Sequence, residues 1–107
     1  MDGSDALYDL LLSDPERAWP EILQFVHSNP RSISAERLVE GLIYEYNDRF
    51  IDRLETVADQ DPVIREVIER ASVGGEATKG AVEFWRLKIK IRSHSVITSD
   101  TERNPSA

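Results

Sequence analysis

The chain has 107 residues, 20 acidic against 13 basic, a formal net charge of -7 and no cysteine. This length is sufficient for one hydrophobic core, and the absence of cysteine excludes disulfides, thiolate zinc sites and a cysteine nucleophile. The acidic balance disfavours nucleic acid as a partner of the whole surface, and no apolar run approaches the ~20 residues of a membrane span.

Two helices are predicted in the first 30 residues. The first covers residues 5–12, and the second follows a capping signal at Ser13 or Asp14, with Pro15 in its first turn. One apolar face of the second helix consists of Trp19, Ile22, Leu23 and Val26. Pro20 lies inside this segment, and its ring clashes with the carbonyl four residues earlier. We therefore expect a kink there, or a short turn before a fresh helix start.

Three further helices are predicted between residues 34 and 71. Ser34 is the expected cap of the first, whose apolar stripe consists of Leu38, Val39, Leu42, Ile43 and Tyr46. Gly41 lies within this stripe and predicts a close helix approach, because glycine is otherwise unfavourable inside a helix. The second stripe consists of Phe50, Leu54, Val57 and Ala58. The third follows a cap at Asp61 and consists of Ile64, Val67, Ile68 and Ala71.

The segment from residue 79 to about residue 92 has two interpretations. Its apolar and basic residues alternate between 85 and 92, which is typical of a half-buried strand. Val82, Trp85 and Ile89 also lie on one face of a helix. We favour the helix, because a lone strand needs a partner, and keep a short β segment near 85–91 as the alternative. Residues 93–107 are expected to form a flexible tail after a single helical domain over 1–92.

These patterns together predict an all-α fold of five or six short helices, packed as antiparallel hairpins around one core. Trp19 and Trp85 are both interpreted as core anchors, because buried aromatic rings contribute a large apolar area. His27, near the end of a helix, is expected to interact with the last carbonyl groups of that helix.

Three short motifs occur in order: D-P-x-x-A-W at residues 14–19, F-I-D-R-L-E at 50–55 and D-P at 61–62. In this order the motifs, over residues 12–70, resemble an uncharacterised bacterial family of all-helical domains. The resemblance implies a compact stack of paired helices, similar to HEAT hairpins. It implies no activity, because that family has no assigned function.

The net charge is distributed unevenly. Residues 1–85 contain 18 acids and 8 bases, a net charge of -10, whereas residues 86–92 contain four bases and no acid. One interpretation is a basic strip that binds phosphate, RNA or an acidic partner. The other is a solvated face that pairs with the acidic body of the same chain.

Carboxylates one helical turn apart, such as Glu45 and Asp48, are able to bind a divalent ion when they face the interior of a bundle. Most acids of this chain lie outside the apolar stripes, which favours a solvated face. An acidic surface that docks a basic protein is the functional interpretation of the same residues.

The sequence contains no hydroxyl-nucleophile motif, glycine-rich phosphate loop or zinc helix. We therefore expect no enzyme, catalytic residue, metal or cofactor. The prediction is a small acidic, cytoplasmic interaction module, an inhibitor or immunity-type protein that binds a basic partner protein. The candidate partner-binding residues are Glu45, Asp48, Asp52, Glu55, Arg86, Lys88, Lys90 and Arg92.

Three alternatives stay open at this point. The basic strip at 86–92 is able to bind RNA or phosphate, with an affinity that falls steeply with salt. A small metal-dependent hydrolase would use Glu45, Asp48 and Asp52. A homodimer would pair an edge segment at 85–91 across a two-fold axis.

Overall fold

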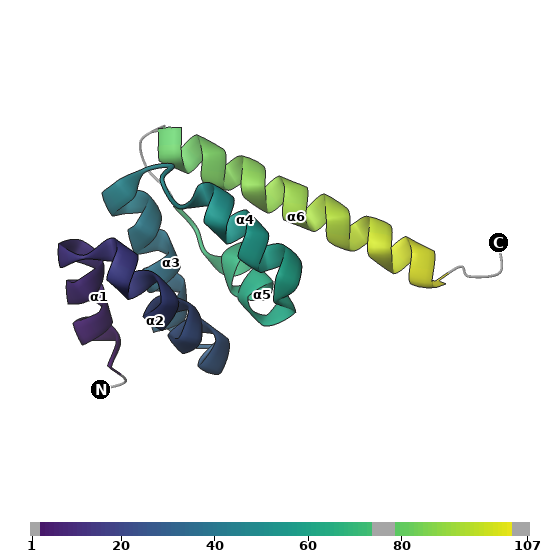
Figure 1. Ribbon diagram of the computed structural model, residues 1–107. Helices are drawn as coiled ribbons and strands as arrows, with labels where there is room; N and C mark the ends of the chain where they lie inside the picture. The colour runs from purple at the N-terminus through teal and green to yellow at the C-terminus, as the bar shows by residue number, and fades with distance from the viewer. Residues whose placement is uncertain (1–2, 74–78, 104–107) are drawn as a thin grey trace.

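The computed structural model describes residues 3–73 and 79–103, and the side chains of the second range as far as residue 92. It contains six helices, shown in Figure 1. They are α1 (Ser4–Ser13), α2 (Pro15–Ser28), α3 (Ile33–Tyr46), α4 (Ile51–Gln60), α5 (Pro62–Arg70) and α6 (Lys79–Arg103). No strand occurs in the described residues, and the all-α prediction is therefore confirmed.

Polar side chains begin three of these helices. The Asp14 carboxylate accepts a hydrogen bond from the Arg17 N–H at 3.3 Å, and the Asp61 carboxylate accepts from the first turn of α5. The predicted cap at Ser34 is wrong, because α3 begins earlier, at Ile33, and its cap is Ser32. The Ser32 hydroxyl accepts from the Ala35 N–H at 3.2 Å.

Pro20 does not divide α2, which runs without interruption from Pro15 to Ser28. The expected fresh helix start is therefore wrong. Pro20 is the sixth residue of the helix, and its ring nitrogen has no N–H to donate to the Glu16 carbonyl. The buried face on either side of it, Ala18, Ile22 and Val26, keeps the helix on the core.

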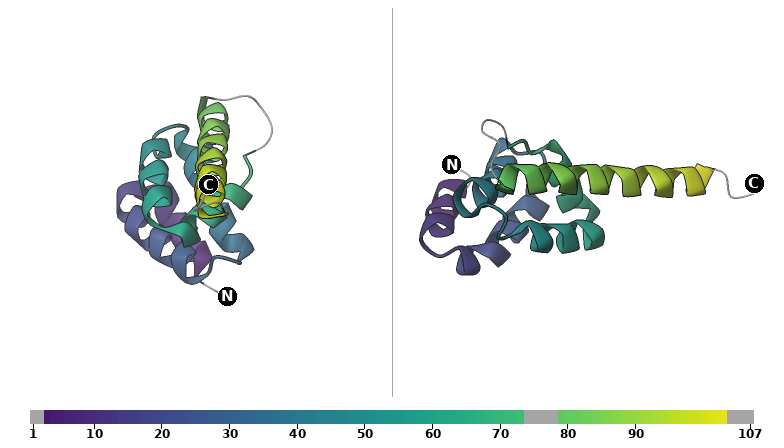
Figure 2. Two further views of the ribbon diagram at one scale, coloured as in Figure 1. Left: turned by 90° about the vertical axis from the view of Figure 1, so that its right-hand side faces the viewer. Right: turned by 90° about the horizontal axis from the view of Figure 1, so that it is seen from above.

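α3 lies at the centre of the molecule and packs against α1, α2, α5 and α6, while α4 packs against α5 and α6 (Figures 1 and 2). At Gly41 the Tyr8 ring of α1 lies so close that an added Cβ would stand 2.8 Å from Tyr8 Cε2. The predicted close approach is thus confirmed. Consecutive helices pack together as α1 with α2 and α4 with α5, whereas a HEAT-like stack stays a prediction.

α6 corrects the β alternative for residues 85–91. The helix buries Phe84, Leu87 and Ile91 on the core, at spacings of three and four residues. A helix satisfies its own backbone hydrogen bonds, so the segment needs no partner strand. The helical face expected to be buried, Val82, Trp85 and Ile89, instead points away from the core.

α6 has 25 residues, which corresponds to about 37 Å of helix, and its second half extends beyond the other five helices (Figures 1 and 2). α6 continues as far as Arg103, into the segment 93–107 that was predicted as a flexible tail. The flexibility of that segment stays a prediction. Residues 104–107 lie outside the described residues. The domain boundary after residue 92 stays a prediction.

The first turn of α6 lies against the turn between α3 and α4. The Gly80 N–H donates to the side-chain carbonyl of Asn47, a residue with a positive φ of 59°. A Cβ at position 80 would stand 2.8 Å from the Asn47 Cα, so only glycine fits without displacing the backbone. Lys79 and Asp48 form an ion pair at 3.1 Å beside this contact.

Candidate functional site

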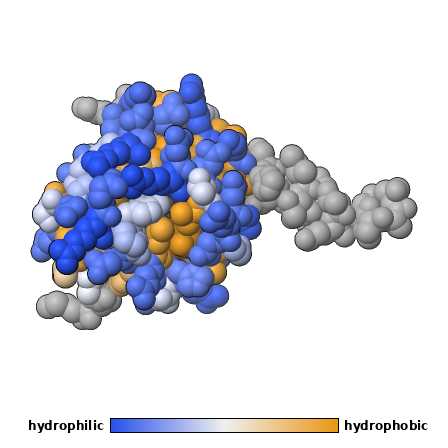
Figure 3. Space-filling view, viewed as in Figure 1, coloured by the Kyte–Doolittle hydropathy of each residue, from blue (hydrophilic) through white to orange (hydrophobic). Residues whose placement is uncertain are grey.

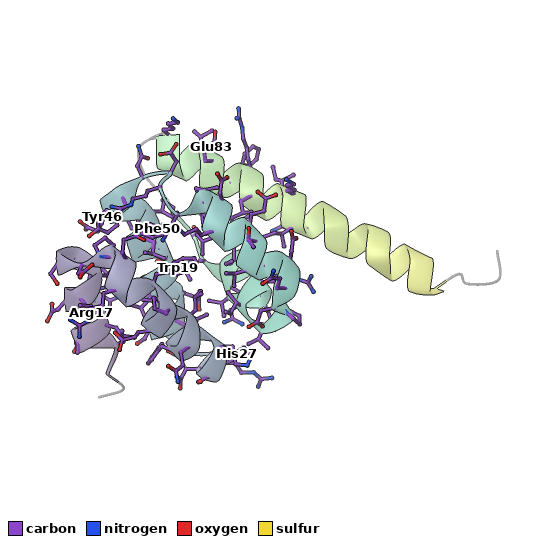
Figure 4. All side chains as sticks on the ribbon, viewed as in Figure 1. Arg17, Trp19, His27, Tyr46, Phe50 and Glu83 are labelled. Atoms are coloured by element: carbon purple, nitrogen blue, oxygen red, sulfur yellow. The ribbon has the colours of Figure 1, made fainter. Side chains whose placement is uncertain are left out.

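Trp19 of the first motif and Phe50 of the second lie beside each other, between α2 and the start of α4 (Figure 4). The Trp19 and Phe50 rings stack with their centroids 5.5 Å apart, and Tyr46 meets Phe50 edge-on at 5.8 Å. Phe50 is fully buried, and Trp19 is half-buried and packs against the core. The prediction of Trp19 as a core anchor is confirmed.

Two arginines cover these rings. The Arg53 guanidinium lies 5.0 Å from the Phe50 ring centroid, and that of Arg49 lies 5.3 Å from it. Glu16 pairs with Arg49 at 2.8 Å and with Arg53 at 2.9 Å. The hydrogen bond from Arg53 lowers the pKa of Glu16; partial desolvation opposes the shift, and Arg49 reinforces it. Each cation here has a partner on its own chain, so we interpret this cluster as a packing unit between helices.

The four acidic candidates do not form one site. Glu45 and Asp52 are exposed, on α3 and α4. Asp48 pairs with Lys79, and Glu55 pairs with Lys90 of α6. Among the residues with described side chains, no three His, Cys, Asp or Glu side chains come together in a way able to hold a metal ion. The hydrolase alternative therefore lacks an assembled metal site in this part of the chain.

The four basic candidates do not form one strip either. A helix turns 100° per residue, so α6 places Arg86 and Lys90 on one side and Lys88 and Arg92 on another. The Lys88 ammonium donates to the Ala71 carbonyl at 2.6 Å, which ties the helix to the end of α5. The interpretation as a face that pairs with the acidic body is confirmed for Lys90, which pairs with Glu55 and has a raised pKa because of that hydrogen bond.

His27 contacts a carboxylate of another helix rather than the last carbonyls of α2. Its Nδ1 lies 2.7 Å from Asp61 Oδ2. The end of α2 is capped instead by Asn29, whose backbone N–H donates to the Phe25 carbonyl at 2.9 Å. Partial burial works to raise the pKa of Asp61, but hydrogen bonds from His27 and from two backbone N–H groups outweigh it, and the pKa is lowered. This pair joins α2 to the start of α5.

Two hollows of the described surface mix acids and bases. One, of about 250 Å³, lies between α1 and α3 and includes Asp5, Tyr8 and Arg37. Burial, then the charge of Glu45, raises the pKa of Tyr8, which makes its hydroxyl a poorer nucleophile. The other, of about 320 Å³, is lined by Glu55, Asp59, Arg65, Lys90 and Ile91. No polar or charged side chain of the described residues is fully buried, in these hollows or elsewhere.

The prediction of Trp85 as a core anchor is wrong, because Trp85 lies on the solvent-facing side of α6. Val82, Trp85 and Ile89, which we call the outer stripe, are 38%, 64% and 42% exposed. Most of the face drawn in Figure 3 is hydrophilic. The signal in the sequence was that residues 82–91 carry two apolar sets at helical spacing, and a helix on the edge of a core buries only one of them.

Comparison of the chain with protein-family models, with curated proteins and with solved structures found no match. Within the described part of the chain, no helix combines the length and the apolar character that crossing a bilayer requires. The resemblance to a bacterial helical family therefore stays a hypothesis based on the three motifs. Any proposal of function has to rest on the surface of the molecule itself.

Proposed function

We propose that this protein is a non-enzymatic interaction module that binds another protein through the outer stripe of α6. The observation that carries the proposal is the exposure of Trp85, 64%, with Val82 and Ile89 beside it on the same helical face. Tryptophan is enriched among the residues that dominate binding energy at protein interfaces. Single exposed apolar residues need no explanation, whereas three at helical spacing on one helix are typical of a helix-in-groove contact.

The opposite face of α6 prepares this surface for binding. Phe84, Leu87 and Ile91 hold the helix on the core, and the Gly80–Asn47 contact fixes where it begins. A partner would therefore meet a helix that is already formed and held, and binding would not incur the conformational entropy cost of folding it. The outer stripe is therefore already in place before a partner binds.

The test is site-specific photo-crosslinking in cells that express the protein. A photoreactive amino acid is placed at Val82, and a second protein carries it at Tyr44, which is 57% exposed on α3. We expect a crosslinked protein at position 82 that is absent at position 44 and is lost when Trp85→Ala is added. Equal crosslinking at both positions, or crosslinking unaffected by Trp85→Ala, would contradict the proposal.

A second candidate is the predicted inhibitor or immunity-type role, with a basic partner on the acidic surface of α3 and α4. Glu45 and Asp52 support it, because both are exposed and carry no ion pair among the described residues. Asp48 and Glu55 support it less, since each already pairs with a lysine of α6. The double variant Glu45→Lys, Asp52→Lys would abolish capture of such a partner and leave crosslinking at position 82 unchanged.

A further inference from the structure

The outer stripe is narrow. Positions 82, 85 and 89 fall within an arc of about 60° on a helix of 3.6 residues per turn. An arc of this width resembles the seam of a helix pair, in which apolar side chains recur every three and four residues. A helix that lies in a bilayer surface presents a broader apolar face.

Basic side chains border the stripe on both sides. Arg86 and Lys90 follow one edge, and Arg92 lies at the other. Between residues 79 and 92, α6 carries five bases and a single acid, Glu83. A surface with an apolar centre and a basic rim is complementary to one with an apolar centre and an acidic rim.

The carboxylates that already pair with these bases do not prevent the bases from pairing with a partner instead. The side chains of Arg86 and Lys90 are 68% and 71% exposed, although the first pairs with Glu83 and the second with Glu55. Exposed ion pairs contribute little to stability, because water screens them and both side chains lose freedom. The guanidinium of Arg86 and the ammonium of Lys90 are therefore able to turn toward carboxylates of a partner.

We infer that the outer stripe binds an apolar helix whose flanks carry Asp and Glu side chains. The inference rests on the proposed function and adds the chemistry of the partner. A second copy of this chain docked α6 against α6 would bring the basic rims together, and like charges repel. An anionic membrane would attract the rim of α6 but repel the body, since residues 1–85 carry a net charge of -10.

The probe is a pair of designed amphipathic peptides, tested on the full chain by fluorescence anisotropy. Both peptides carry leucine at the a and d positions; one carries glutamate at e and g, and the other carries lysine there. We expect the glutamate peptide to bind about tenfold more tightly than the lysine peptide at low salt, and this preference to shrink at high salt.

Two variants test the site. Trp85→Ala is expected to weaken binding of the glutamate peptide about tenfold, whereas Tyr44→Ala, an exposed aromatic of α3, leaves it unchanged. The charge variant Arg86→Glu, Arg92→Glu is expected to reverse the preference between the two peptides. Arg17→Glu, at an exposed position of α2, is the control for a charge reversal outside α6 and keeps the preference. Circular dichroism of each variant checks that the helices are intact.

The outcomes separate this inference from the function on which it rests. Binding that needs Trp85 but treats the two peptides alike would overturn the acidic partner and leave the interaction surface standing. Absence of binding by either peptide, a dimer lost on Trp85→Ala in light scattering, or binding to phosphatidylserine vesicles that Trp85→Ala abolishes would also overturn it. Failure of the proposed function itself would show independently, as crosslinking at position 82 that does not depend on Trp85.

Discussion

Trp19 and Trp85 each lie on an amphipathic helix, but their surroundings differ completely. Trp19 stacks on Phe50 and lies under the guanidinium of Arg53, whose charge is paired with Glu16. Trp85 is 64% exposed on the outer face of α6. The first tryptophan is enclosed by groups of its own chain, and the second faces solvent beside basic side chains. The contrast separates a residue that holds the fold from one that is free to bind a partner.

The two helices have equally many neighbours. α2 packs against α1, α3 and α5, and α6 packs against α3, α4 and α5, so the difference lies in which apolar side of each helix meets them. α6 lies on the edge of the bundle, and its core-facing side is filled by Phe84, Leu87 and Ile91. A second apolar side on such a helix has no neighbour within the described residues.

The largest expected effect on stability comes from truncating Trp19, the enclosed tryptophan. Trp19→Ala should lower the free energy of unfolding by about 3 kcal/mol, the lower end of the range for aromatic truncations, because the ring is only half-buried. Urea unfolding followed by circular dichroism measures it. Trp19→Phe keeps a ring on Phe50 and should cost clearly less. A loss below about 1 kcal/mol for Trp19→Ala would show that the cluster does not hold the fold.

The next effect concerns how α6 is held. Gly80→Ala should destabilise the protein by about 1–3 kcal/mol, because the new Cβ would meet the Asn47 backbone at 2.8 Å. The sign is informative, since Gly to Ala within a helix ordinarily stabilises by up to about 1 kcal/mol. Thermal unfolding gives the sign, and hydrogen exchange of α6 amides shows whether the loss is local. A more stable variant would mean that α6 does not dock at Asn47.

A smaller effect on the free energy of unfolding is expected at Asp61, and it depends on pH. Asp61→Ala removes the cap of α5 and should cost about 1 kcal/mol at neutral pH, whereas Asp61→Asn keeps a capping oxygen and loses only the charge. The pKa of Asp61 is lowered from its ordinary value of 3.8, so its contribution is complete above that value and is lost as pH falls through the lower folded value.

Urea unfolding repeated between neutral and acid pH measures this effect. The acid loss of stability should be smaller in Asp61→Asn than in the natural chain, because asparagine does not titrate. If the free energy of unfolding falls equally with pH in both proteins, titration of Asp61 does not contribute to the acid loss of stability. Neither Asp61→Ala nor Asp61→Asn should change the affinity of the outer stripe for the peptide, because His27 and Asp61 lie at the junction of α2 and α5.

The smallest expected effect is the most direct test of the comparison. Trp85→Ala should change the free energy of unfolding by no more than about 0.5 kcal/mol, because an exposed side chain away from special contacts contributes little to folding. The same denaturant series used for Trp19→Ala measures it. A loss similar to that of Trp19→Ala would place Trp85 in the core and remove the surface on which the proposed function rests.

Local rules explain which elements were predictable. The caps at Asp14 and Asp61 and the apolar stripes of α2 to α5 depend on residues a few positions apart, and the structure confirms them. Pro20 shows where such rules fail. Its local penalty predicted a kink or a fresh helix start, and the fresh start does not occur, because packing of Ala18, Ile22 and Val26 on the core stabilises one continuous helix.

The candidate site was predictable in composition and not in arrangement. The sequence contains the four bases at 86–92, and a strand would have placed them on one face; the helix divides them. Their pairing with Glu55 and the carbonyl of Ala71 depends on how α4 and α5 lie against α6, which is a long-range contact. Residue spacing within one segment contains no information about it.

By itself, the sequence determined the helical class, the cap at Asp61 and the presence of two apolar sets between residues 82 and 91, because these depend on spacing along the chain. Only the tertiary structure decided which set faces the core. Phe84, Leu87 and Ile91 are buried because Gly80 allows α6 to lie against Asn47 in one orientation, and that orientation leaves Trp85 in solvent. The helix alone permits either rotation, and contacts with residues far away in the chain select between them.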